Sequence, residues 1–348
     1  MESAQLLHQI GLTVDGEEAE MLADLSALRC IDQYLWLGSD EGISVERFTL
    51  RGNDAADHQP FSLAEFFDLP SSEDEVDVEG LAYADYYLWI TGSHSLKRKK
   101  PKPGGSFEDT VERLGTLSCE ENRYLIGRIP LVDGQLYRQC PHPKDPKQQL
   151  TAAQIKRKKT GNQLTHALAK DLHLGPFIRA AIPGKDNGFD VEGIAVTGDR
   201  IFLGLRGPVL RGWAVLLELS PKVTKSGHLK LKTLDGKSCY RKHFLDLGGL
   251  GIRDLCWDGD DLLILAGPTM DIAGMARVFR VPDAIATLTE DRCLQPNAIL
   301  EVPDQEGDKA EGISLLTQDG NGLLVVYDSP GPERLSGTTV KADVFALR

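Results

Sequence analysis

Long apolar runs, paired cysteines and paired histidines are all missing from this 348-residue sequence. No run approaches the roughly 20 apolar residues that a membrane-spanning helix needs. The start, MESAQLLHQIGLTVDGEEAE, lacks the basic and apolar regions of a signal peptide. The cysteines form no C-x-x-C pair and the histidines no H-x-x-x-H pair, which excludes the common zinc signatures. The sequence therefore predicts a cytoplasmic protein with reduced thiols and no membrane contact.

Positive charge is scarce over most of the chain, which carries a formal net charge of −13. This balance makes nucleic acid an unlikely partner. Residues 96–160 are the exception, with 15 Lys and Arg against 7 Asp and Glu, a balance of +8 that leaves −21 for the rest. Two KRKK runs lie there, at Lys97–Lys100 and Lys156–Lys159. The basic segment predicts an acidic partner, although such runs are also typical of solvated surfaces.

The tetrapeptide DVEG occurs twice, at Asp77–Gly80 and Asp190–Gly193, and belongs to a longer repeat. In each copy of the repeat, a short strand, a polar turn and a strongly apolar strand follow one another. In the first four copies the opening residue lies nine positions before the apolar run, and in the fifth it lies twelve before it. The opening residues are Ser26, Glu79, Glu192, Arg253 and Glu311.

A third strand follows each copy and a fourth candidate precedes it, for example EFFDLP before the second copy and PFIRAAIPG before the third. Four antiparallel strands repeated around an axis predict an all-β fold, a single β-propeller domain over residues 1–348. Five four-stranded repeats are recognisable. The wide spacing between the second and third copies leaves six blades open. We expect basic, partly helical insertions in the second repeat at residues 94–122 and 132–175, and an N-terminal strand that closes the ring.

Several unusual strings occur in one order along the chain: HSLKRKKP, PGKDNG, GLRGPVLRG, ILAGPTM and VVYDSP. In these strings the sequence resembles the bacterial domain-of-unknown-function 3616 family over nearly its whole length. The resemblance implies a β-propeller fold. It implies no activity and no catalytic residues.

The first strand of each propeller blade lines the central channel, so the five opening residues should meet in a ring at one mouth of that channel. Glu79, Glu192 and Glu311 would repel one another there unless something compensates them. One hypothesis is a metal site for Ca²⁺ or Mg²⁺, which prefer carboxylate oxygens. Another is a structural network with Arg206 and Arg253, and a third is hydrogen bonding from backbone N–H groups beside close-packed glycines.

The loops around the ring supply further candidates for binding a small anionic molecule. Arg206 and Arg211 flank a Pro-Val-Leu tip, and arginine binds carboxylate or phosphate in a bidentate manner. The other predicted ligand-binding residues are Lys185, Asn187, Asp254, Thr269 and Asp328.

Two functions remain open at this stage. One is a metal-assisted hydrolase or lyase acting on a small anionic ester, phosphoester or lactone. In it Glu79, Glu192 and Glu311 hold the metal, Arg206 and Arg253 orient the anion, Glu192 is also a catalytic residue and His94 moves protons. The alternative is a non-catalytic propeller that senses a ligand or binds another protein.

Overall fold

Antiparallel strands build most of the protein in its computed structural model, which describes residues 4–15, 21–72, 74–234, 236–270, 274–303, 308–316 and 322–347. The chain is all-β, as predicted. The first repeat holds β2 (Leu25–Ile31), β3 (Tyr34–Ser39), β4 (Ser44–Arg51) and β5 (Asp54–Ser62) in that spatial order. The second holds β6 (Val78–Ala84), β7 (Tyr87–Gly92), β10 (Ile126–Val132) and β14 (Ala153–Gln154).

The remaining repeats follow the same order. The third holds β15 (Asp190–Thr197), β16 (Arg200–Gly207), β17 (Trp213–Leu219) and β20 (Arg241–Asp246), with β24 (Arg292–Leu294) added in parallel. The fourth holds β21 (Gly251–Asp258), β22 (Asp261–Gly267), β23 (Ala276–Val281) and β25 (Asn297–Val302). The fifth holds β26 (Lys309–Leu316), β27 (Gly322–Asp328), β29 (Thr339–Ala346) and the N-terminal β1 (Leu6–Thr13).

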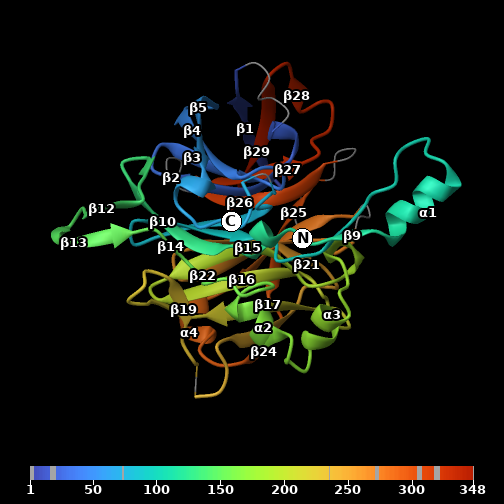
Figure 1. Ribbon diagram of the computed structural model, residues 1–348. Coiled ribbons are helices and arrows are strands. Elements are labelled where there is room, and N and C mark those ends of the chain that lie inside the picture. Colours follow the sequence, from blue (N-terminus) through green and yellow to red (C-terminus); the bar gives the residue numbers. More distant parts are fainter. Residues whose placement is uncertain are drawn as a thin grey trace.

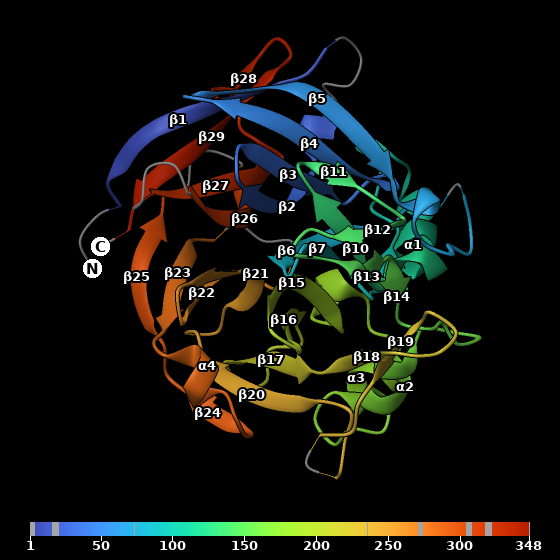
Figure 2. The same ribbon diagram turned by 90° about the vertical axis from the view of Figure 1, so that its left-hand side faces the viewer.

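The first strands of the repeats lie nearest to the centre of the molecule, and the sheets are arranged around them (Figure 2). Each first strand contacts the first strand of the next repeat, in the closed order β2, β6, β15, β21, β26 and back to β2. Their residues are almost all buried, as expected for strands covered on both faces. Antiparallel sheets around a common axis are the architecture of a β-propeller.

The N-terminal strand joins the ends of the chain, as the sequence predicted. Strand β1 pairs with the C-terminal β29 in antiparallel fashion and with β5 in parallel fashion, so that the first and fifth sheets are continuous. The two termini accordingly lie side by side (Figure 2). This pairing protects two outer edges that would otherwise be open.

Two predicted outer strands are wrong. In EFFDLP the chain forms the end of a 3₁₀ turn (Leu63–Glu65), and the outer strand of the first repeat is β5, which ends before this string at Ser62. In PFIRAAIPG it forms helix α3 (Gly175–Arg179), and β14 supplies the outer strand of the second repeat. Strand β5 is largely polar and partly exposed, so it lacks the apolar alternation that identifies a strand in sequence.

The second repeat carries the longest connections. Between β7 and β10 lie β8 (Lys97–Arg98), α1 (Phe107–Gly115), β9 (Leu117–Ser118) and a 3₁₀ turn (Glu121–Tyr124). Helix α1 projects from the body as an arm (Figure 1). Between β10 and β15 lie β11 (Gln135–Leu136), β12 (Gln139–His142), β13 (Asp145–Thr151), α2 (Gln163–Leu168), α3 and a 3₁₀ turn (Gly184–Asp186).

The other elements are short. They are β18 (Pro221–Val223), β19 (Leu229–Leu231), α4 (Ala284–Thr287) and β28 (Leu335–Ser336). Across the described ranges, every helix is too short or too polar to cross a membrane. All six cysteines are free.

Candidate functional site

The opening residue of every repeat lies at a β-bulge in the first strand. The pairing with the second strand passes from Leu25 to Ala27, from Val78 to Gly80, from Ile252 to Asp254 and from Ala310 to Gly312, so that one residue is skipped each time. In the third repeat the pairing skips both Glu192 and Gly193. A bulged residue is released from the ladder and its side chain is re-aimed. The skipped residues are Ser26, Glu79, Glu192, Arg253 and Glu311, the five predicted from the repeat.

The glycine that follows each ring glutamate allows neighbouring first strands to approach closely. A methyl group on Gly80 would lie 2.9 Å from the backbone nitrogen of Ile194 in the next repeat. A methyl group on Gly193 would lie 2.7 Å from Cα of Asp254, and this glycine has φ +87°. The EG pair therefore combines a re-aimed carboxylate with backbone contact between repeats, which is the close packing that one of the sequence hypotheses expected.

Two arginines bind the ring carboxylates. Arg253 Nη1 lies 2.5 and 2.6 Å from the two oxygens of Glu311 and 3.3 Å from Oε2 of Glu192, while its Nη2 donates to the Pro268 carbonyl. Arg206 Nη1 lies 2.7 Å from Oε1 of Glu192, and its Nη2 binds Asp190. All five of these side chains are buried. These contacts form the arginine network that the second sequence hypothesis expected.

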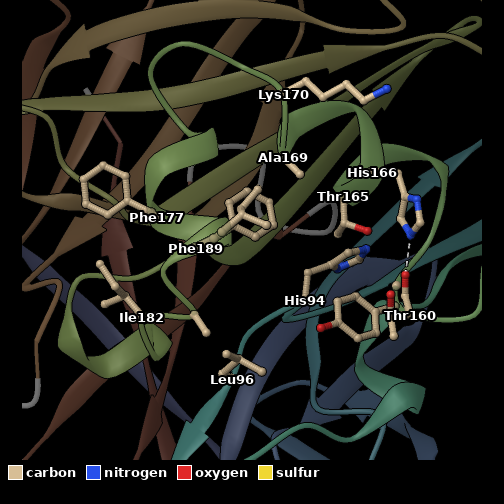
Figure 3. A pocket seen from close by; sticks show the side chains of 14 residues that line it. His94, Leu96, Thr160, Thr165, His166, Ala169, Lys170, Phe177, Ile182 and Phe189 are labelled. Carbon is tan, nitrogen blue, oxygen red and sulfur yellow. Dashed lines mark hydrogen bonds between the residues drawn. The ribbon is translucent and has the colours of Figure 1, made fainter.

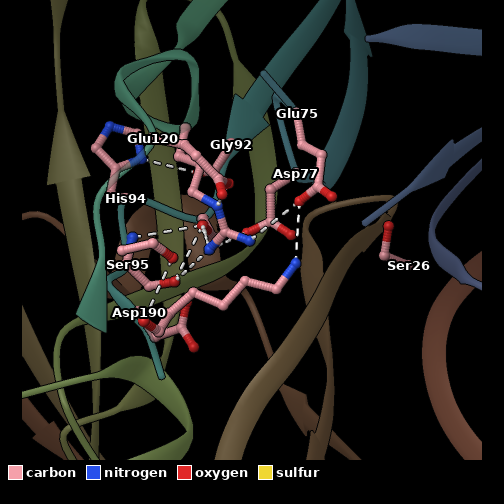
Figure 4. Close-up of polar contacts among 12 residues, drawn as sticks. Ser26, Glu75, Asp77, Gly92, His94, Ser95, Glu120 and Asp190 are labelled. Atoms are coloured by element: carbon pink, nitrogen blue, oxygen red, sulfur yellow. Dashed lines mark hydrogen bonds and ion pairs between the residues drawn. The ribbon is translucent and has the colours of Figure 1, made fainter. Parts of the chain in front are cut away.

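A third arginine, Arg123, holds the corresponding carboxylate of the second repeat and was not predicted. Its Nη1 lies 2.9 Å from Oδ2 of Asp77 and its Nε lies 2.9 Å from Oε2 of Glu120. The hydroxyls of Ser93 and Ser95 also accept from Nη1 (Figure 4). Asp77 and Asp190 each lie two residues before a ring glutamate, and each has its own arginine.

Three carboxyl groups in the same region have no such partner. Asp24, Asp40 and Glu79 accept no side-chain hydrogen bond and form no ion pair within the described part of the chain. Burial raises the pKa of Asp24 to about 6 and that of Asp40 to about 7, and the exposed Lys185 opposes both shifts. Burial, reinforced by Asp77 and other neighbouring carboxylates, raises the pKa of Glu79 well above its ordinary value. We call these three groups the unpaired carboxyls.

Their charges act on one another and on the ring. Asp24 and Asp77 both raise the pKa of Asp40, and Asp40 in turn raises that of Glu79 after the larger effects of burial and closer acids. The unpaired carboxyls therefore border one region at the start of β2 and β6, which we call the channel mouth. Each of the three arginines is already shared between at least two acceptors. The charges of the unpaired carboxyls are therefore not balanced by these arginines, and negative charge is in excess at the channel mouth.

Deeper in the ring, Arg29 connects the first repeat to three others. Its guanidinium donates to the carbonyls of Leu81, Leu255 and Ile313, and it lies 3.4 Å from Oδ1 of Asp254. Asp254 also accepts from the backbone nitrogens of Leu255 and Ile313. The structure thus places the predicted ligand-binding residue Asp254 in a fully bonded internal position, where burial raises its pKa to about 7.

The other predicted ligand-binding residues lie on loops. Asn187 accepts from the backbone nitrogen of Val209, a local contact that holds two loops together. Asp328 forms a backbone bridge with Asp24, and Ser329 donates a hydrogen bond to its carboxylate. Lys185 and Arg211 are exposed, and Thr269 is partly exposed in the loop after β22.

His94 faces away from the ring glutamates toward the helical connection. Its Nδ1 lies 2.8 Å from the Gly92 carbonyl, so Nδ1 carries the proton, and its Nε2 accepts from the side-chain amide of Asn162 at 2.8 Å. Burial lowers the pKa of His94 to about 4, so the ring is neutral near pH 7. Both ring nitrogens are engaged within the protein. The proposed proton transfer by His94 stays a prediction, and it would require these bonds to open.

The described residues contain no group of three or more His, Cys, Asp or Glu side chains arranged to hold a metal ion. Glu192 and Glu311 both form ion pairs with Arg253, whereas Glu79 forms none with this arginine. The predicted Ca²⁺ or Mg²⁺ site of Glu79, Glu192 and Glu311 therefore stays a prediction.

The repeat itself could have pointed to some of the site residues that were not predicted. Asp24, Asp77 and Asp190 all lie two positions before the opening residue of their repeat. Arg29 occupies the third position after its opening residue, where the other repeats have Ala82, Ala195, Cys256 and Ser314. No repeat signal marks Arg123, because it precedes a third strand after a long connection.

A sequence model of one protein family matches residues 24–343. The chain belongs to the DUF3616 family. The description of this family is "Protein of unknown function", so membership brings no reaction or ligand. No curated protein matches the sequence of this DUF3616 protein.

Solved structures with a similar fold share little sequence identity with this chain. Glutaminyl cyclase from Myxococcus xanthus has a TM-score of 0.45 at 8% identity, with all of both chains covered. The aldose sugar dehydrogenase from Streptomyces coelicolor, bound to PQQ, has 0.40 at 11%, covering 99% of this chain and 100% of that one. Streptogramin B lyase has 0.38 at 8%, with all of both chains covered. At TM-scores below 0.5, these likenesses carry no argument about the chemistry of the DUF3616 protein.

Proposed function

We propose that the DUF3616 protein is a five-bladed β-propeller whose channel mouth binds a small ligand through a positively charged group. The closed order of five first strands supports the blade number. The connection from β10 to β15 supports it too, because its strands pair with β10 or only with each other and contribute no further inner strand. Ligand binding is the function that the geometry supports best, with or without catalysis.

The observation that carries the proposal is the set of unpaired carboxyls. A carboxylate that leaves water without a hydrogen-bond donor or a cation is costly, so buried charges in proteins are normally paired. In the second and third repeats an arginine supplies that pairing for Asp77 and Asp190. In the first repeat nothing equivalent faces Asp24 or Asp40 among the described residues. An ammonium or guanidinium group would supply the missing partner.

The ligand charge proposed here is opposite to the one predicted from the sequence. That prediction relied on Arg206 and Arg253 as free anion-binding groups, and both are engaged by carboxylates in the structure. The lysines whose charges lower the pKa of Asp24, Lys185 and Lys97, are exposed, and Lys97 already pairs with Glu75. Converging, partly buried acids therefore favour a cationic group over an anionic one.

A second candidate function is a hydrolase or lyase, and the pKa of Asp40 near 7 favours it. A general acid or base acts best when its pKa lies near the working pH. Asp328 is one of the carboxylates that raise the pKa of Asp24 to about 6, and Asp24 in turn raises the pKa of Asp40. A divalent cation at the mouth would supply the Lewis acid of the predicted mechanism, since hard cations prefer carboxylate oxygens.

Melting temperatures measured with added ligands test the proposal. At pH 8, agmatine, which carries a guanidinium and an amine, should raise the midpoint of the parent protein by about 4 °C or more at saturation, because it binds only the folded state. Glu79→Gln should lose this response, while Glu108→Gln, a change on the exposed arm, should keep it. Parallel series at equal ionic strength contain Ca²⁺, Mg²⁺, phosphate or NaCl alone.

Each series decides a different point. A midpoint that is indifferent to agmatine, Ca²⁺ and Mg²⁺ would remove the cationic site. A response to phosphate alone would restore the anionic ligand predicted from the sequence. A response to Ca²⁺ or Mg²⁺ that chelator reverses and Glu79→Gln abolishes would support the metal-assisted alternative.

The pH dependence of the free protein gives a separate prediction for Asp40. Its pKa is about 7 in the folded state and about 3.8 in the unfolded state, so the folded state binds the extra proton between these values. The contribution of the Asp40 carboxyl to the free energy of unfolding is therefore fully present below about pH 4 and is lost as the pH rises through 7. Asp40→Asn should raise the free energy of unfolding by about 1–2 kcal/mol at pH 8 and by nearly nothing at pH 4.

Urea denaturation at pH 4.5, 6 and 8 measures this difference. Asp15→Asn is the matched control, since Asp15 is exposed and follows the outer strand β1. A gain of equal size at pH 4.5 and 8 would show that the Asp40 carboxyl does not titrate as described.

A further inference from the structure

A cavity that is separate from the channel mouth lies beside the helical connection of the second repeat. Its volume is about 370 Å³. Helices α2 and α3, the loop through His94 and the residue before β15 form its walls (Figure 3). This volume lies within the roughly 300–1,000 Å³ of typical small-molecule sites and exceeds the water-sized voids of ordinary protein packing.

The walls of this cavity are mainly apolar. Aromatic rings and branched aliphatic side chains line the cavity, and they come from segments up to 93 positions apart, from Leu96 to Phe189. Figure 3 shows Phe177, Phe189 and Ile182 on one side and His94 and Thr165 on the other. The apolar lining residues are Leu96, Ala169, Phe177, Ile178, Ala181, Ile182 and Phe189.

The polar groups in the inner wall already have partners. His94 is engaged at both ring nitrogens, and Thr165 exchanges hydrogen bonds with the backbone of Asn162. His166 Nε2 lies 2.6 Å from the Thr160 carbonyl. A ligand therefore meets no unsatisfied buried donor or acceptor from the described lining residues. The inner part of the cavity selects for an apolar body.

The rim has a different character. Lys170 is exposed at the edge of the cluster of lining side chains (Figure 3) and forms no ion pair with any described residue. It is the only Lys or Arg among the lining residues. An anionic group on the outer end of a ligand would gain from this ammonium, while an apolar ring fills the interior.

We propose that this cavity binds a small amphipathic molecule, an apolar ring system with an anionic group at its outer end. The site is distinct from the channel mouth in both place and ligand charge. Its inner wall nevertheless adjoins the channel mouth along the chain. Ser93 and Ser95 lie on either side of His94, and their hydroxyls accept hydrogen bonds from Arg123.

Fluorescence titration of the full chain with 1-anilinonaphthalene-8-sulfonate tests the site. We expect saturable binding at one site. Ala169→Phe, which fills the cavity from the end of α2, should weaken binding about tenfold or more, equivalent to about 1.4 kcal/mol. Ala180→Phe adds the same ring on an exposed residue outside the lining and should change the affinity less than about twofold. Ala169→Leu serves as a smaller filling if the phenylalanine impairs folding.

Charge at the rim is tested with a matched pair of probes. Lys170→Glu should weaken the sulfonate probe by about three- to tenfold, in line with an exposed ion pair of up to about 1 kcal/mol reversed in sign. N-phenyl-1-naphthylamine, the same ring system without the sulfonate, should bind both proteins equally.

Two controls separate this site from other surfaces. Phe107→Glu removes the most exposed apolar side chain of α1, which is 77% exposed, and should leave binding intact. Glu79→Gln, which tests the channel mouth, should also leave it intact. Absence of saturable binding, or binding that ignores Ala169→Phe and Ala169→Leu, would overturn the proposal, and so would binding that disappears with Phe107→Glu.

Discussion

Replacing Arg253 with methionine should lower the free energy of unfolding by about 3–5 kcal/mol, a large part of the 5–15 kcal/mol that stabilises a typical domain. Methionine keeps the apolar stem and removes the charge. Glu311 then loses its ion-pair partner, and the Pro268 carbonyl loses its donor. Glu192 is less affected, because Arg206 still holds its other oxygen. Urea denaturation at pH 8 measures the loss.

The stranded carboxylate explains most of the expected loss, so removing it should restore stability. Adding Glu311→Gln to Arg253→Met should recover about half of the loss or more, which a double-mutant cycle would show as strong coupling. Lower pH should act in the same direction. Burial raises the pKa of Glu311, so protonation neutralises it as the pH falls, and the defect of Arg253→Met should be smaller at pH 5 than at pH 8.

Arg277→Met in the same repeat is the control. Arg277 pairs with Glu301 at 3.1 Å, but the two side chains are 31% and 36% exposed. Such a pair contributes about 0–1 kcal/mol. Equal losses for Arg253→Met and Arg277→Met would show that the ring ion pairs are solvated, and the description of a buried network would then be wrong.

The ring could be predicted from the sequence because local strings of similar pattern and spacing produce the same bulge in each repeat. The spacing from each opening residue to its apolar run sufficed to select Glu79 and Glu192 as equivalent positions. Their partners could not be predicted in this way. Arg123 binds Asp77 across 46 positions, and Arg29 reaches Asp254 across 225, in pairings that depend on which strands become neighbours.

Outer strands and side-chain directions were harder to predict for related reasons. Strand β5 is polar because one face meets solvent, so its sequence resembles a loop. His94 was grouped with the ring because its loop lies there. Its φ of +57° and its bonds to Gly92 and Asn162 direct the imidazole into the neighbouring cavity instead. A repeat locates a backbone position, whereas the aim of one side chain depends on its own neighbours.

A large effect of a change without charge should come from Gly193→Ala, in the second copy of DVEG. Gly193 has φ +87°, and an added methyl would lie 2.7 Å from Cα of Asp254 and 3.0 Å from two further backbone atoms. None of these atoms belongs to a flexible side chain. We expect a loss of about 3–5 kcal/mol, from about 1–2 kcal/mol of backbone strain and about 1–3 kcal/mol of overpacking.

Two other glycines separate these contributions. Gly198, in the turn of the same hairpin, has φ +55° and no neighbouring atom within 4 Å of an added methyl, so Gly198→Ala should cost only the strain, about 1 kcal/mol. Gly80 lacks the positive φ, but an added methyl would lie 2.9 Å from the backbone of Ile194, so Gly80→Ala should cost about 1–3 kcal/mol. If Gly193→Ala costs no more than Gly198→Ala, backbone conformation alone selects this glycine. A loss equal to the other two together would show that the EG pair serves both the bulge and the contact between repeats.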